Sequence, residues 1–216
     1  METKSLSFFV GALSFLLCTT VAENGRVLKV TIFYESMCSD SMSFITDQLD
    51  PTFEKVGQYL KIDLVPYGNA EHKISKNGSY TFTCQHGPNE CRFNKIHSCS
   101  LKYLSDDNQV VNFISCLMAV KNEDKVLEEC AKKFNVDLQK INSCSSSHEG
   151  DVLLAANGDR THSFKPKVSW VPTIVFNDKY NDDDQQLAET NLLQAVCKKL
   201  DPKPNECDMK ISVVHV

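Results

Sequence analysis

The chain has 216 residues, 42% of them hydrophobic, and 28 acidic against 23 basic side chains give it a formal net charge of −5. A mildly acidic chain without basic clusters argues against nucleic acid and anionic membranes as partners. The length suits one domain with a sizeable hydrophobic core.

The first 22 residues have the layout of a cleaved secretory signal peptide. Lys4 lies near the start, an apolar stretch covers residues 6–17, and small residues lead to Ala22. The apolar stretch is too short to span a bilayer, which disfavours the alternative of an uncleaved anchor. We therefore expect cleavage after Ala22, one mature domain over residues 23–216, no membrane span, and entry into the secretory pathway.

The first predicted elements form a strand–helix–strand unit. Residues 27–34 are dense in β-branched and aromatic side chains, which is typical of a buried strand. Apolar residues then recur every three or four positions from Met42 to Phe53, which predicts a helix with Pro51 as a point of kink or interruption. Residues 60–66 predict a second strand, so the opening is a βαβ unit, normally parallel.

The middle of the chain, about residues 77–165, is interpreted as a cysteine-rich, helical insertion. Residues 77–100 are polar, and we expect them to be rich in loops; the sequon at Asn77 is a candidate glycosylation site. Helical periodicity over residues 110–118 and 126–138 predicts an αα-hairpin, and helical character returns at residues 151–156.

The C-terminal part returns to β structure. Residues 169–176 predict a strand beginning near Pro172, and Lys179 with Tyr180 predicts a short edge strand before a final helix over residues 187–200. The acidic run at residues 181–184 is interpreted as a solvated turn in preference to a metal site. With the insertion set aside, βαβ followed by ββα is the thioredoxin arrangement, an α/β fold.

The cysteine count predicts one unpaired thiol. Ten cysteines minus Cys18 of the signal leave nine in the mature chain, so in an oxidising compartment at least one is free or bonded outside the chain. No Cys-x2-Cys pair occurs, which disfavours zinc, and we expect no metal. Eight cysteines are expected to form four disulfides: Cys84, Cys91, Cys99, Cys116, Cys130, Cys144, Cys197 and Cys207.

Two of these disulfides are predicted as specific pairs. Cys116–Cys130 joins the two arms of the αα-hairpin, and Cys197–Cys207 flanks a short turn. The other four cysteines allow three connectivities, among which the sequence does not choose. A different scheme, with Cys38 in a disulfide, is the alternative to a free Cys38.

Cys38 is the candidate nucleophile because it lies where the first strand ends and the first helix begins. Unpaired N–H groups and a partial positive charge at a helix N-terminus favour the thiolate, the form that attacks disulfides. The carboxylate of Asp40 opposes this effect, and the sequence does not decide between them. In such a fold Pro172 is expected to be cis and to face Cys38, and the backbone of Val171 is expected to pair with an extended substrate.

The residues Cys84-Gln-His-Gly87, Glu90-Cys91, Asn94 and Cys99 match, position by position, the signature of the gamma-interferon-inducible lysosomal thiol reductase family. The segments 34–38 and 64–70 are similar to that family too, so the resemblance covers about residues 27–207. It implies a thioredoxin-like fold with a helical insertion, an extracellular or lysosomal location, and reduction of protein disulfides. Carried over by position, Cys38 is the attacking cysteine and the second cysteine would fall at Ser41.

The serine at position 41 restricts the chemistry that we expect. Without a second cysteine, the mixed disulfide on Cys38 must be resolved by an external thiol such as glutathione or cysteine, or by a substrate thiol. Ser41 can donate a hydrogen bond to the thiolate. We expect protein or peptide disulfides and small thiols as partners and no bound cofactor; His86 is expected to hold its loop rather than act as a base.

Two other functions stay open at this point. The chain could be a thioredoxin-like binding protein that captures peptides or thiols without turnover. It could also be a structural disulfide-rich module without redox chemistry, in which Cys38 resists alkylation.

Overall fold

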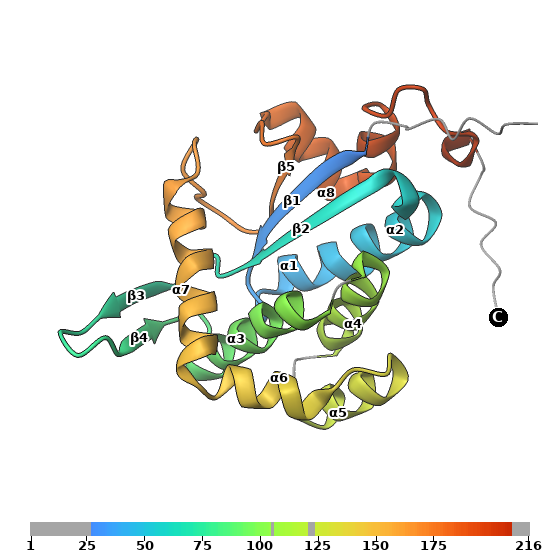
Figure 1. Cartoon of the computed structure of the whole chain (residues 1–216). Helices are drawn as coiled ribbons and strands as arrows, with labels where there is room; N and C mark the ends of the chain where they lie inside the picture. The colour runs from blue at the N-terminus through green and yellow to red at the C-terminus, as the bar shows by residue number, and fades with distance from the viewer. Residues whose placement is uncertain (1–26, 105, 121–123, 209–216) are drawn as a thin grey trace, which may run out of the picture.

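A three-stranded sheet forms the centre of the protein in a computed structural model, which describes residues 27–104, 106–120 and 124–208 (Figure 1). The expected signal peptide lies outside the described residues. Strand β1 (Leu28–Tyr34) pairs in parallel with β2 (Leu60–Pro66) and antiparallel with β5 (Thr173–Phe176), in the order β2-β1-β5. The expected parallel βαβ unit is therefore present.

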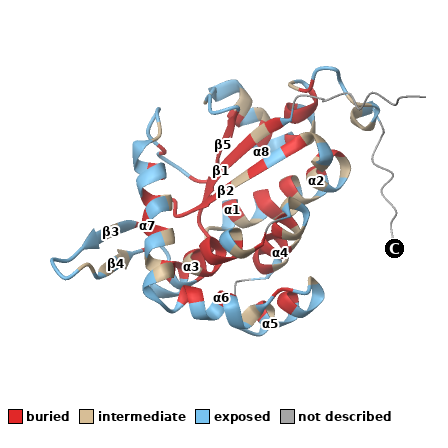
Figure 2. Cartoon of the chain, in the orientation of Figure 1, coloured by how far each residue is buried: buried red, intermediate tan, exposed pale blue. Residues whose placement is uncertain are grey.

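One face of the sheet is buried along its length and the other is buried toward the end near Cys38, which explains the largely apolar sequence of β1. Val30, Ile32 and Tyr34 join the large core that the helices form. The opposite face places Phe33 with Val175 in a smaller core, against which Cys38 packs. Figure 2 shows this burial in the strands, with exposed residues on the outer helices.

The helical segment after Cys38 is continuous but changes its winding. It comprises α1 (Ser39–Phe44), a π-helical turn η1 (Ile45–Leu49) and α2 (Asp50–Val56), followed by the 3-10 turn η2 (Gly57–Tyr59). Pro51 lies in the first turn of α2. Since proline has no backbone N–H to donate to the preceding turn, a wider π turn before it is a reasonable local solution. The expected interruption at Pro51 is thus a change of helix type.

The insertion is more ordered than the sequence predicts. It begins a few residues before the expected residue 77, with a β-hairpin, β3 (Glu71–Ile74) and β4 (Tyr80–Thr83), which projects from the body of the protein (Figure 1). Helices α3 (Pro88–Tyr103), α4 (Asp107–Ala119), α5 (Asp124–Lys133), α6 (Leu138–Ser145) and α7 (His148–Ser163) follow.

The expectation of a loop-rich segment over residues 77–100 is wrong for a physical reason. The buried face of α3 carries many polar side chains, among them Asn94, His97, Ser98 and Ser100, so it shows little apolar periodicity. The predicted αα-hairpin of residues 110–118 and 126–138 corresponds to α4 and α5.

The described chain contains four disulfides, three within the insertion and one in the C-terminal segment. The structure joins Cys116 to Cys130 and Cys197 to Cys207, the two pairs expected from the sequence. It chooses Cys84–Cys91 and Cys99–Cys144 among the open connectivities. Cys99–Cys144 ties α3 to α6, so the insertion is cross-linked to itself.

The C-terminal segment differs from the sequence prediction in two places. The expected edge strand at Lys179–Tyr180 is reduced to one isolated bridge between Phe176 and Lys179. The acidic run is not a turn: Asn181 caps helix α8 (Asp182–Cys197) by accepting a hydrogen bond from the Asp184 N–H at 3.0 Å. Carboxylates in a first helical turn interact favourably with the helix dipole, which accounts for the run. A short 3-10 turn, η3 (Asn205–Asp208), ends the described chain.

Among the described residues, no helix combines the length and the apolar character needed to cross a membrane.

Candidate active site

Cys38 is the one cysteine outside a disulfide in the described part of the chain. It is the N-cap residue of α1, half-buried, with an extended backbone (φ −72°, ψ 125°). Its side chain makes no capping hydrogen bond, so the sulfur is not engaged with the helix that follows. Strand β1 and helix α1 thus present a free thiol at the end of the sheet.

The loop before β5 lies against this thiol. The Cys38 Sγ is 3.9 Å from the Val171 carbonyl oxygen, within the range of a weak S–H···O hydrogen bond. The Val171–Pro172 peptide bond is cis, and both residues are buried. The structure therefore brings Cys38 to the Val171–Pro172 pair, although Cys38 and Val171 are 133 residues apart in sequence.

Ser41 lies on the buried side of α1 with 0% exposure. Its Oγ accepts a hydrogen bond from the Glu35 N–H at 3.4 Å, and the described contacts include no hydrogen bond between Ser41 and Cys38. The serine therefore holds the backbone of the active-site loop at Glu35 and is shielded from solvent.

Helix α3 of the insertion holds the active-site loop. The Ser36 N–H donates to Asn94 Oδ1 at 3.0 Å, and the Ser36 hydroxyl donates to the Glu90 carbonyl at 3.3 Å. The Tyr34 hydroxyl is 3.0 Å from Nδ1 of His97. Two residues of the cysteine signature, Glu90 and Asn94, thus position the segment that carries Cys38.

A cluster of three titratable side chains lies beside this loop. His86 Nδ1 is 2.6 Å from Glu90 Oε2 and 3.4 Å from Glu35 Oε2, and the His86 N–H donates to Glu90 Oε1 at 3.0 Å. Burial raises the pKa of Glu35, and the charge of Glu90 adds to this, while the Asn69 N–H and His86 oppose it. The His86 contacts agree with the expected loop-holding role, and the described contacts place no bond between His86 and Cys38.

Two cavities flank Cys38. One of about 620 Å³ lies along Asp40, Trp170 and Pro172, and another of about 450 Å³ is lined by Met37, Ser39, Met42, His86 and Met118 among others. Trp170 is an exposed large hydrophobic residue. Both cavities are therefore bordered by neighbours of the thiol, Met37 and Ser39 in one and Asp40 and Val171 in the other.

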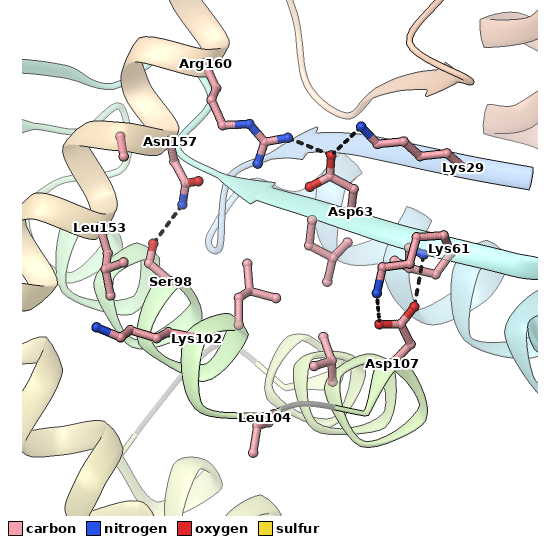
Figure 3. A pocket seen from close by; sticks show the side chains of 15 residues that line it. Lys29, Lys61, Asp63, Ser98, Lys102, Leu104, Asp107, Leu153, Asn157 and Arg160 are labelled. Atoms are coloured by element: carbon pink, nitrogen blue, oxygen red, sulfur yellow. Dashed lines mark hydrogen bonds and ion pairs between the residues drawn. The ribbon is translucent and has the colours of Figure 1, made fainter.

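A third cavity, of about 860 Å³, lies away from the thiol (Figure 3). Most of its charged residues are paired with one another: Asp63 with Arg160 at 2.6 Å and Lys29 at 3.4 Å, and Lys61 with Asp107 at 2.7 Å. Lys102 pairs with Glu149, which lies outside the lining. None of the expected site residues lines it. Its paired charges indicate a structural role.

Asn77, the candidate glycosylation site, lies in the turn between β3 and β4 and is exposed. Its side chain accepts hydrogen bonds from Ser75 Oγ and from the Ser79 N–H. The position is accessible to a modifying enzyme.

Solved structures identify the fold to which this sheet belongs. BdbD of Bacillus subtilis in its oxidised form aligns with a TM-score of 0.56 over 87% of this chain and 91% of that one, at 14% identity. DsbA of Chlamydia trachomatis aligns with a TM-score of 0.53 over 77% and 87%, at 16% identity. At such identities the likeness concerns the fold, and the expected thioredoxin-like α/β fold is confirmed.

Sequence relatives identify the family. The family model described as "Gamma interferon inducible lysosomal thiol reductase (GILT)" matches residues 29–134. A gamma-interferon-inducible lysosomal thiol reductase-like protein of Anopheles gambiae is 34% identical over 83% of this chain and 80% of its own length. The gamma-interferon-inducible lysosomal thiol reductase of Carassius auratus is 35% identical over 81% and 69%. The chain belongs to the GILT family of thiol reductases.

Sequence reasoning missed Glu35 and the cluster that it forms with His86 and Glu90. The signal was partly visible, since His86 and Glu90 belong to the cysteine signature. Glu35 is about fifty residues away in the chain, and only the packing of α3 against the end of β1 brings the three together.

Proposed function

We propose that this protein is a thiol–disulfide oxidoreductase that acts on protein or peptide disulfides through Cys38 alone. The observation that carries the proposal is the free, half-buried Cys38 at the start of α1, beside Val171 and cis-Pro172, in a chain whose other described cysteines are all paired. Membership of a thiol reductase family supports it.

The proposed disulfide reduction uses a single protein thiol, that of Cys38. The Cys38 thiolate attacks one sulfur of the substrate disulfide, forms a mixed disulfide, and releases the other sulfur as a thiolate. A small external thiolate then attacks the Cys38 sulfur and releases the second substrate thiol. A second external thiolate attacks the external sulfur now bonded to Cys38. This step frees the Cys38 thiolate and forms the disulfide of the two external thiols. Two external thiols are thus oxidised for each substrate disulfide that is reduced.

The same intermediate has another fate. If the released substrate thiolate, or another thiol of the same substrate, attacks the mixed disulfide, the substrate is isomerised and no external electrons are used. Val171 and Pro172 are assigned to substrate binding, since the Val171 carbonyl faces the thiol.

Ser41 has a supporting role in this scheme. It is fully buried and bonded to the loop backbone, so it contributes to the geometry of the loop and not to the resolution of the mixed disulfide. In the thiolate state its hydroxyl proton can turn toward Cys38.

The proposed setting is the secretory pathway, with the mature chain extracellular or lysosomal and glycosylated at Asn77. Four disulfides fit an oxidising route of synthesis. Relatives named as lysosomal thiol reductases support the lysosomal alternative. Secretion of the expressed chain from cultured cells tests the secretory route. A lower mass of the Asn77→Gln variant than of the wild-type protein tests glycosylation at Asn77.

The decisive experiment compares wild type, Ser41→Cys and Cys38→Ser in a protein-disulfide reduction assay with excess glutathione. We expect many turnovers for wild type, faster reduction by Ser41→Cys because an internal thiol resolves the intermediate, and background rates for Cys38→Ser. A wild-type protein that stops after one mixed disulfide per chain would instead be a capture protein without turnover.

A further inference from the structure

The cluster beside the active-site loop contains a set of donors suited to a metal ion. Glu35 directly follows β1, His86 lies in the loop before α3, and Glu90 lies in the first turn of α3. One carboxylate oxygen from each glutamate and one ring nitrogen of the histidine all lie within 4.8 Å of one another. Three elements thus converge on one point.

The Glu35 carboxylate is oriented toward this point. Its Oε1 accepts a hydrogen bond from the Asn69 N–H at 2.6 Å. Its Oε2 is fully buried, has no hydrogen-bond partner, and has His86 Nδ1 at 3.4 Å, a nitrogen already engaged with Glu90 at 2.6 Å. One oxygen is therefore fixed by the backbone and the other is left for an additional partner.

The turn that fixes Glu35 requires a glycine. Gly68 has φ +63°, and a Cβ atom at this position would lie 2.2 Å from Glu35 Cγ. The close approach brings the Asn69 N–H to the carboxylate. This backbone support is the kind of outer contact that orients metal ligands in proteins.

The cluster has a deficit of positive charge. The side chains of Glu35 and Glu90 are both 0% exposed, and among the described residues their ion pairs involve His86 and no lysine or arginine. One imidazole thus faces two buried carboxylates. A buried charge without compensation is unfavourable, so the site favours a further cation.

We propose that Glu35, His86 and Glu90 bind a divalent transition-metal ion, with zinc as the best match. Imidazole nitrogen combined with carboxylate oxygen suits zinc, whereas calcium and magnesium prefer all-oxygen sites. Three protein ligands leave a position open, and the half-exposed His86 ring gives access from the adjoining cavity. The site goes beyond the thiol chemistry, since Cys38 is not one of its ligands.

The test is a titration of chelator-treated, full-length mature protein with Zn²⁺ at pH 7 against a chromophoric chelator. We expect one equivalent to bind to wild type, with affinity at least tenfold lower in Glu35→Gln and His86→Gln. His148→Gln is the matched control, because His148 lies outside the cluster, with its ring 5.8 Å from that of Tyr80. Cys38→Ser is expected to keep wild-type affinity. No binding at 100-fold excess zinc over protein, equal affinity in Glu35→Gln and His86→Gln, or loss of binding in Cys38→Ser would each overturn the proposal.

A second measurement needs no variant and therefore does not depend on variants folding. X-ray absorption of zinc-loaded wild type is expected to show nitrogen and oxygen neighbours at roughly 2.0–2.1 Å. A sulfur neighbour at about 2.3 Å would place the zinc on Cys38 and refute the site. Because wild-type turnover of disulfides is measured separately, failure of the metal site and failure of the proposed function are distinguishable.

Discussion

Two groups of carboxylates flank the same pair of strands and behave in opposite ways. At the end of β1, Glu35 is buried next to Glu90, and burial raises its pKa. On the outer side of β2, burial also opposes the ionisation of Asp63, but Arg160 and Lys29 outweigh it and lower the pKa of that carboxyl (Figure 3).

The difference lies in the supply of positive charge and not in burial alone. Arg160 from α7 and Lys29 from β1 reach Asp63 at 2.6 and 3.4 Å, so that group is a finished set of ion pairs. The Glu35 cluster has one imidazole for two carboxylates. We interpret the paired group as structural and the unpaired one, which adjoins the free thiol, as functional.

Replacement of Cys38 by serine is expected to have the largest effect on activity and almost none on stability. The half-buried thiol makes one weak contact to Val171, so serine fits the position. Disulfide reduction with excess glutathione is expected to fall to the uncatalysed rate, with an unchanged thermal midpoint. The control is Asp63→Asn in the paired group, which is expected to keep wild-type activity; activity in Cys38→Ser would remove the thiol from the mechanism.

Gly68→Ala is expected to have the largest effect on stability, about 3 kcal/mol or more in the free energy of unfolding. The added Cβ meets Glu35 at 2.2 Å in a backbone conformation with positive φ. Gly78→Ala is the matched control, because Gly78 also has positive φ (+84°) but no atom within 4 Å of the new Cβ. We expect about 1 kcal/mol for the control by denaturant unfolding. Equal losses would show that backbone strain, and not the approach to Glu35, makes Gly68 necessary.

Asp63→Asn is expected to cost about 1.5 kcal/mol at pH 7, because a charged hydrogen bond to Arg160 is lost. The pKa of Asp63 is lowered in the folded state, so its stabilisation is present above the pKa of the unfolded chain, about 3.9, and is lost as the pH falls through the folded pKa. Between pH 5 and pH 2, the free energy of unfolding should therefore fall more steeply with decreasing pH for wild type than for the variant. Parallel curves would contradict the assigned ion pair.

Lys61→Ala is expected to have the smallest effect, about 0.5 kcal/mol. Its ammonium pairs with Asp107 at 2.7 Å, but the lysine side chain is 62% exposed and solvent screens the pair. Chemical denaturation in low salt and in 0.5 M salt measures the difference in free energy of unfolding between wild type and Lys61→Ala. This difference should be smaller in 0.5 M salt. A loss as large as that of Asp63→Asn would mean that exposure does not distinguish the two pairs.

The amino-acid sequence was sufficient for the fold class and for the identification of the free thiol. The apolar pattern of residues 27–34 and 60–66, and the position of Pro172 before a β segment, depend on local order and burial, which leave a clear periodic signal. Cys38 was identifiable because an odd number of cysteines and a strand–helix junction are both properties of the linear chain. The signature of residues 84–99 placed the chain in its family.

Tertiary structure decided what depends on contacts between distant segments. Helix α3 was missed because its buried face is polar, and the choice of Cys99–Cys144 required the packing of α3 on α6. The Glu35–His86–Glu90 cluster also arises from that packing, since charge compensation among buried groups depends on distances in space. The sequence thus determined which thiol is free, and the folded chain determined what surrounds it.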